Sequence, residues 1–153
     1  MNTGAAVSDE DLRTAYQLAA KIGVAFAANR YPGDAHIVNL TTVGDPEEPA
    51  EIAAWFRGKT WLNVIADISD VWPTGDAPGY MTDAAHAYYL PAYLVAALDQ
   101  RPGVGTMDRL VWHLAPPAPD APAWERTLFR RFLGLSLGQR KVIVDFLTYV
   151  AEL

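Results

Sequence analysis

The feature that most constrains the fold is a central stretch, 84–98, of 15 residues without a formally charged side chain. It is bounded by Asp83 and Asp99, and Pro91 lies inside it. A helix that crosses a membrane needs about 20 mainly apolar residues. The stretch is therefore too short to span a membrane, and we predict that it forms a buried helix at the centre of a core.

Thr82 and Asp83 are placed to begin this central helix, which is predicted to run to about Asp99. A proline inside a helix has no amide hydrogen and clashes with the carbonyl four residues earlier, at a cost of about 3 kcal/mol. We therefore expect a kink at Pro91, or two short helices that meet there.

A second helix is predicted near the N-terminus. Ser8 is expected to cap it by accepting a hydrogen bond from the amide of Asp11. Arg30 is expected to end it, before a turn in which Gly33 permits a positive φ. Apolar residues recur every three or four positions and predict one buried stripe of Leu12, Tyr16, Ala19, Ile22 and Phe26.

The segment between these two helices contains several shorter elements. Residues 45–49 are acidic and rich in proline, which is typical of a helix start, and Gly58 is expected to end that helix. Thr60 could cap a short helix over 61–68, although the same apolar residues could form a strand. Residues 71–80 contain two prolines and two glycines and are predicted to be loop.

Three more helices are predicted after the central one. Thr106 is placed to cap a helix that runs through Leu114, and another begins at about Pro122. The proline-rich residues 115–122 between them are expected to be extended. The last helix is marked by Ser136 and Gln139, the capping-box pattern of a serine followed three residues later by glutamine.

These elements predict a mostly α-helical, single compact domain over residues 1–153. It has six or seven short helices, a central helix kinked at Pro91 and an ordered core from about residue 8. A chain of 153 residues can bury roughly 68–70% of its unfolded surface. The chain has no cysteine, which excludes disulfides and thiolate metal sites. The acidic N-terminus lacks the features of a signal peptide. A cytoplasmic location is taken as the default expectation.

The segment Tyr88-Tyr89-Leu90-Pro91-Ala92-Tyr93-Leu94 resembles a small bacterial domain family of unknown function. The similarity extends to the turn at 31–34, to Trp61 and to the serine-capped C-terminal helix, and it would cover roughly residues 12–150. The resemblance implies a bacterial, mostly helical, single-domain protein, and it brings no activity with it.

Two pairs of polar side chains have the spacing of a candidate site. Asp83 and His86 lie three residues apart on one helix face, and Asp34 and His36 are nearly adjacent on a loop. Together they could supply two nitrogens and two oxygens to a Zn²⁺ or Fe²⁺ ion. In the alternative interpretation, His86 packs on the central helix and Asp83 caps it. No cofactor motif is recognised, so no metal or cofactor is predicted.

Tyrosines crowd around Pro91. They are core residues whose hydroxyl groups bond to backbone groups freed by the proline, or they line a pocket or a partner surface. A pocket would lie where the 31–36 loop meets the central helix, with Asp34 and His36 as the acid–base pair. Its binding residues would be Tyr31, Tyr88, Tyr89, Tyr93 and His86.

Charge is distributed unevenly along the chain. Residues 1–100 contain 5 Lys or Arg and 13 Asp or Glu, whereas residues 101–153 contain 7 and 5. The two parts attract each other within one fold, or the acidic part binds a basic protein. The overall charge of −6 argues against nucleic-acid binding.

Two functional hypotheses follow. Because no catalytic set is recognisable, the first is an acidic helical binding module that docks a basic protein partner, in the manner of an immunity protein. The alternative is a small-molecule enzyme or sensor with its pocket between the 31–36 loop and the Pro91 helix.

Overall fold

The computed structural model describes residues 7–39, 47–68, 77–99, 114 and 116–152. These residues form seven α-helices and one 3₁₀ helix, η1 (Asp34–His36). Within the same ranges the one strand-like pairing is an isolated antiparallel β-bridge between Val38 and Met81. The prediction of a mostly α-helical domain with six or seven helices is therefore confirmed.

Helix α1 (Asp9–Phe26) begins as predicted. Asp11 donates its amide to the Ser8 hydroxyl at 3.1 Å, and the Asp11 carboxylate accepts the Ser8 amide at 3.3 Å. The helix ends at Phe26, so the expected end at Arg30 is wrong. Beyond it, Gly33 has the positive φ of 97° that its turn requires.

The predicted buried stripe of α1 is wrong in its first half. The fully buried residues are Leu18, Ile22 and Phe26, whereas Leu12 and Tyr16 are 45% and 74% exposed. Tyr16 precedes Ile22 by six positions, which places it about 120° away around the helix. The residues of the predicted stripe therefore lie on two neighbouring faces of α1. The core covers only the face that contains Leu18, Ile22 and Phe26.

Three short helices come between α1 and the central helix. Helix α2 (Glu47–Phe56) is followed by Gly58 with a φ of 72°, and α3 (Trp61–Val64) is capped by Thr60. The strand alternative for 61–68 is therefore wrong, and the helix is shorter than expected, because residues 65–68 form turns. The expectation of loop throughout 71–80 is wrong for its end, because α4 (Ala77–Tyr80) is helical, with its proline in the first turn where the missing amide is tolerated.

The central helix α5 (Asp83–Leu98) is one continuous helix with Pro91 inside it, so the alternative of two short helices is wrong. Its N-cap is Thr82, whose hydroxyl accepts the Ala85 amide at 3.1 Å. Asp83 is the first helical residue and not the cap. Eleven of the 16 residues are buried, which makes α5 the centre of the core.

Two helices complete the described chain. Helix α7 (Ala123–Leu133) begins where predicted, and α8 (Leu137–Glu152) is preceded by the predicted capping box of Ser136 and Gln139, with both hydrogen bonds at 3.1 Å. Residues 116–118 are not helical, and a turn follows them. The helix predicted from Thr106 lies outside the described residues, apart from its end at Leu114.

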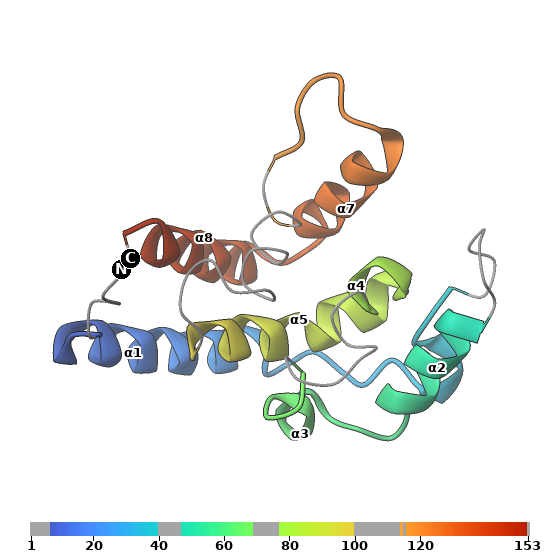
Figure 1. The fold of residues 1–153 in the computed structure, drawn as a ribbon, viewed down its shortest axis with the longest axis horizontal. Helices are drawn as coiled ribbons and strands as arrows, with labels where there is room; N and C mark the ends of the chain where they lie inside the picture. The colour runs from blue at the N-terminus through green and yellow to red at the C-terminus, as the bar shows by residue number, and fades with distance from the viewer. Residues whose placement is uncertain (1–6, 40–46, 69–76, 100–113, 115, 153) are drawn as a thin grey trace, which may run out of the picture.

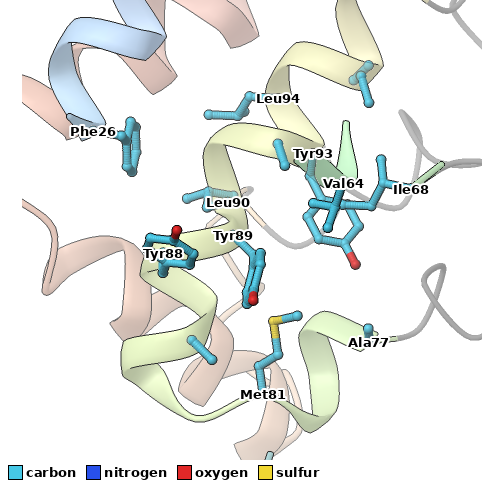
Figure 2. Packing of buried hydrophobic residues seen from close by; sticks show 14 of the residues in the cluster. Phe26, Val64, Ile68, Ala77, Met81, Tyr88, Tyr89, Leu90, Tyr93 and Leu94 are labelled. Atoms are coloured by element: carbon cyan, nitrogen blue, oxygen red, sulfur yellow. The ribbon is translucent and has the colours of Figure 1, made fainter. Parts of the chain in front are cut away.

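Helix α1 packs against both α8 and α5, and in Figure 1 it runs below α8. Its neighbour α8 runs antiparallel to it: Tyr149 near the end of α8 donates to the Asp11 carbonyl, and Gln139 near its start donates to the Ala25 carbonyl. Helix α3 and helix α7 also pack against α5. Figure 2 shows Tyr93 on the side of Val64 and Ile68 within this core. None of the helices in the described ranges is long and apolar enough to span a membrane.

Candidate functional site

The loop after α1 meets the central helix, as the sequence predicts. The ring of Tyr31 packs edge-on against the ring of Tyr88, with centroids 5.8 Å apart. The Tyr31 hydroxyl donates to the Asp34 carboxylate and accepts the Gly58 amide at 2.9 Å. Partial burial, together with the hydrogen bond to Asp34, raises the pKa of Tyr31. This tyrosine therefore connects its own loop to α5 and to the turn after α2.

The tyrosines around Pro91 are core residues. Tyr88, Tyr89 and Tyr93 are 5%, 0% and 3% exposed. The ring of Tyr89 lies 4.9 Å from that of Tyr88 and 4.6 Å from that of Phe56, measured between centroids. Figure 2 shows Tyr89 and Tyr88 together among the buried side chains. These three tyrosines fill the core, as one of the two interpretations predicts.

The hydroxyl of Tyr89 has backbone partners, but they are not those freed by the proline. It donates a shared hydrogen bond to the carbonyls of Lys59, at 2.8 Å, and Phe56, at 3.1 Å. Phe56 is the last residue of α2, where carbonyls lack intrahelical donors, and its carbonyl also accepts the Lys59 amide at 3.0 Å; Lys59 lies in the turn that follows. The expectation that tyrosine hydroxyls bond to the groups freed by Pro91 is wrong for Tyr89.

The carbonyl that Pro91 leaves without an amide partner is that of Ala87, four residues earlier. The side chain of Asn29 donates to it at 3.1 Å. Gln139 in turn donates to the Asn29 side chain at 3.0 Å and to the Ala25 carbonyl at 3.2 Å. This partly buried polar network joins the end of α1 and the residues just beyond it to α5 and α8, and it supplies the Ala87 carbonyl with a donor in place of the missing amide.

Asp34 and His36 do not meet the other predicted pair. Both side chains are exposed, and the His36 carbonyl accepts a hydrogen bond from the Thr82 hydroxyl at 2.6 Å. Asp83 and His86 lie instead in a cleft between α5 and α7. No group of three or more potential metal-binding side chains is found among the described residues.

The cleft between α5 and α7 has a volume of about 330 Å³. We call it the α5–α7 cleft; its lining residues are Asp83, His86, Ala87, Arg130, Arg131, Gly134 and Leu135. His86 is 8% exposed and Leu135 is 7% exposed. The cleft therefore combines an apolar floor with several groups that can carry charge.

Arg131 is held firmly at this cleft. Its Nε donates to Asp83 at 3.0 Å, and its two terminal nitrogens donate to the carbonyls of Pro78 at 2.7 Å and Met81 at 2.5 Å. The Arg131 side chain is 8% exposed, whereas that of Asp83 is 88% exposed. The contact fastens α7 to the chain segment that leads from α4 into α5.

Arg130 differs from its neighbour. It is exposed, and no hydrogen bond or ion pair of its guanidinium is found within the described part of the chain. Sequence reasoning missed both arginines. The available signal was an adjacent arginine pair within the net-positive segment 101–153, but nothing in the sequence places that pair beside Asp83 and His86.

The fold and the cleft together define an all-helical domain with a cationic cleft beside its central helix. A family model described as a family of unknown function, DUF6714, matches residues 15–153. The chain therefore belongs to this family. No curated protein matches the chain. No solved structure matches it either.

Proposed function

We propose that this protein is a binding domain that holds a small molecule with an acidic group in the α5–α7 cleft. The observation that carries the proposal is the exposed Arg130 on the lining of a cleft whose other arginine, Arg131, is already hydrogen-bonded within the protein. An arginine can hold a carboxylate or a phosphate through two parallel hydrogen bonds. In the described residues this side chain has no other anionic partner.

The dimensions and lining of the cleft favour a small ligand. Its volume of about 330 Å³ lies at the lower end of the range for small-molecule sites, about 300–1,000 Å³. Ala87 and Leu135 give it apolar surface, and the first turn of α5 contributes the positive end of a helix dipole. An acid with a compact apolar body is complementary to this combination.

Docking of a basic protein by the acidic part of the chain, the first hypothesis from sequence, has less support. The acidic first turns of α1 and α2 lie near opposite ends of the molecule in Figure 1. Tyr80 donates to one of the α2 carboxylates, that of Glu48, at 2.7 Å. The acidic residues of these two helices therefore do not form one continuous face, and the cleft is the better-supported site.

The proposal can be tested by isothermal titration with benzoate, acetate and phenyl phosphate. We expect at least one of these acids to bind at millimolar concentration or below, and Arg130→Gln to weaken its binding about tenfold, because a hydrogen bond to a charged group contributes about 1.5 kcal/mol or more.

Arg126→Gln is the matched control. Arg126 is also an exposed arginine of α7, four residues earlier, and it does not line the cleft. Equal losses in the Arg126 and Arg130 variants would contradict a specific site, as would the absence of binding by all three acids.

A further inference from the structure

The two arginines of the α5–α7 cleft are adjacent in sequence but differ in what they can offer a ligand. The guanidinium of Arg131 is bonded to Asp83, Pro78 and Met81 and is largely buried. Arg130 is exposed and has no such partners among the described residues. Arg131 is therefore a positioning residue, and Arg130 is the residue that can contact a bound acid.

Asp83 determines how much positive charge the cleft presents. Its carboxylate accepts the Nε hydrogen of Arg131 through one oxygen, Oδ1, while 88% of its side-chain surface remains exposed. The negative charge thus lies on the solvent side of the guanidinium that it neutralises. With histidine counted as neutral, Arg130 is the one formal charge on the cleft lining that no opposite charge from the described residues compensates.

We infer that the α5–α7 cleft selects a singly charged carboxylate and that Asp83 excludes doubly charged ligands such as phosphate monoesters; this inference rests on the function proposed above. A single carboxylate is balanced by Arg130. A second negative charge in the same cleft meets the exposed oxygen of Asp83, and repulsion between like charges is a common source of specificity.

The test compares two ligands with the same ring and different charge. Benzoate carries one negative charge, and phenyl phosphate carries about two at pH 8 because the second pKa of a phosphate monoester is about 6. The measured quantity is the ratio of their dissociation constants in the whole protein. We expect the unmodified protein to bind benzoate more tightly than phenyl phosphate. Asp83→Asn should shift the ratio of the dissociation constants about fivefold in favour of phenyl phosphate. A change of this size is expected when one charge a few ångströms from the ligand, near water, is removed.

Asp67→Asn is the matched control, because it removes one negative charge from an exposed residue outside the cleft. The ratio of the two dissociation constants in the Asp67→Asn variant should equal that of the unmodified protein. Asp83→Ser provides a second variant if thermal melting shows that the asparagine variant is unfolded, since serine is tolerated at the start of a helix.

Each outcome has a distinct meaning. Binding of benzoate with an unchanged ratio in both Asp83 variants overturns the inference and leaves the proposed function standing. Tighter binding of phenyl phosphate by the unmodified protein also overturns it. If neither probe binds the unmodified protein or the Asp83 variants, the inference falls, and the proposed site falls with it when acetate also fails to bind.

Discussion

Tyr89 combines an apolar ring at the centre of the core with a polar group that the core must accommodate. The ring is fully buried, and the hydroxyl donates to the carbonyls of Phe56 and Lys59. The ends of helices carry carbonyls without intrahelical partners, and burying such groups unpaired is unfavourable. A tyrosine at this position therefore stabilises the end of α2 as well as the core.

Tyr89→Phe keeps the ring and removes this donor. We expect a loss of about 1 kcal/mol in the free energy of unfolding at pH 7, because the Lys59 carbonyl then loses this donor, whereas the Phe56 carbonyl keeps the Lys59 amide at 3.0 Å. Urea denaturation followed by circular dichroism measures the change. Tyr16→Phe, at a residue that is 74% exposed, is the control and should change stability by less than about 0.5 kcal/mol.

The same tyrosine predicts how stability depends on alkaline pH. Burial raises the pKa of Tyr89 above that of an unfolded tyrosine, about 10. The folded state therefore keeps its proton where the unfolded chain begins to lose it. The associated stability is complete below about pH 10 and is lost as the pH rises above that value. The fall in stability between pH 9 and 11 should be smaller in Tyr89→Phe, and an identical fall would contradict this assignment.

The sequence could predict that the tyrosines near Pro91 matter, but not what each one does. The crowding of these tyrosines was compatible with a core or with a pocket. Whether a tyrosine is buried depends on which distant segments of the chain pack against it. The partners of Tyr89 lie 30 and 33 residues earlier in the chain. A local pattern contains no information about such partners.

At the scale of elements, α5 depends on the segment just after α1 to compensate for its proline. Pro91 cannot donate to the Ala87 carbonyl, and Asn29, just beyond α1, does so instead. The proline thus makes α5 dependent on a side chain from a neighbouring segment. Sequence reasoning predicted the disturbance at Pro91 but not its compensation.

This dependence predicts a measurable coupling between the two residues. Asn29→Ala should lower the free energy of unfolding by about 1 kcal/mol, because it leaves the Ala87 carbonyl unpaired. In a Pro91→Ala background the restored amide can donate to this carbonyl. Asn29→Ala should then lower the free energy of unfolding by clearly less. A double-mutant cycle measures the coupling, and additive effects would show that the two residues act independently.

Arg131 fastens α7 to the start of α5. Its three hydrogen bonds join α7 to Pro78, Met81 and Asp83. We expect Arg131→Gln to destabilise the fold by about 2–3 kcal/mol, since hydrogen bonds of a largely buried cation are lost. Hydrogen exchange should accelerate in α7 more than in α8, whereas Arg126→Gln should leave both unchanged. An equal acceleration of hydrogen exchange in α7 and α8 would contradict a local role of Arg131 in holding α7 against α5.

Helix starts were easier to predict than helix ends or helix faces. The caps at Ser8, Thr60, Thr82 and Ser136 are local signals, and the structure confirms each of them. The buried face of α1 was predicted wrongly for Leu12 and Tyr16. Which side of an amphipathic helix is covered depends on where α5 and α8 lie, and the periodicity of α1 does not specify that.

At the scale of the whole molecule, α1, α5 and α8 share one core. Phe146 of α8 is fully buried in the same cluster as Phe26 of α1 and Tyr89 of α5. We expect Phe146→Ala to lower the free energy of unfolding by about 3–5 kcal/mol. Circular dichroism and tryptophan fluorescence should then still report one common transition. Val144→Ala, at a residue that is 52% exposed, is the control, and separate transitions would contradict a single core.

The candidate site shows the limit of prediction from sequence most clearly. Asp83 and His86 were recognised as a pair, and both lie in the cleft. The arginines that give the cleft its charge come from α7, and Arg131 contacts Asp83 across 48 positions of sequence. Only the packing of α7 against α5 brings the two segments together.

The antiparallel pairing of α1 with α8 also has a consequence for synthesis on the ribosome. Contacts between these helices join residues 114 and 138 positions apart. During translation, the apolar face of α1 therefore emerges long before α8 exists to cover it. Exposed apolar surface of this kind makes nascent chains prone to aggregation and attracts chaperones. We therefore expect α1 to require protection until α8 has been made.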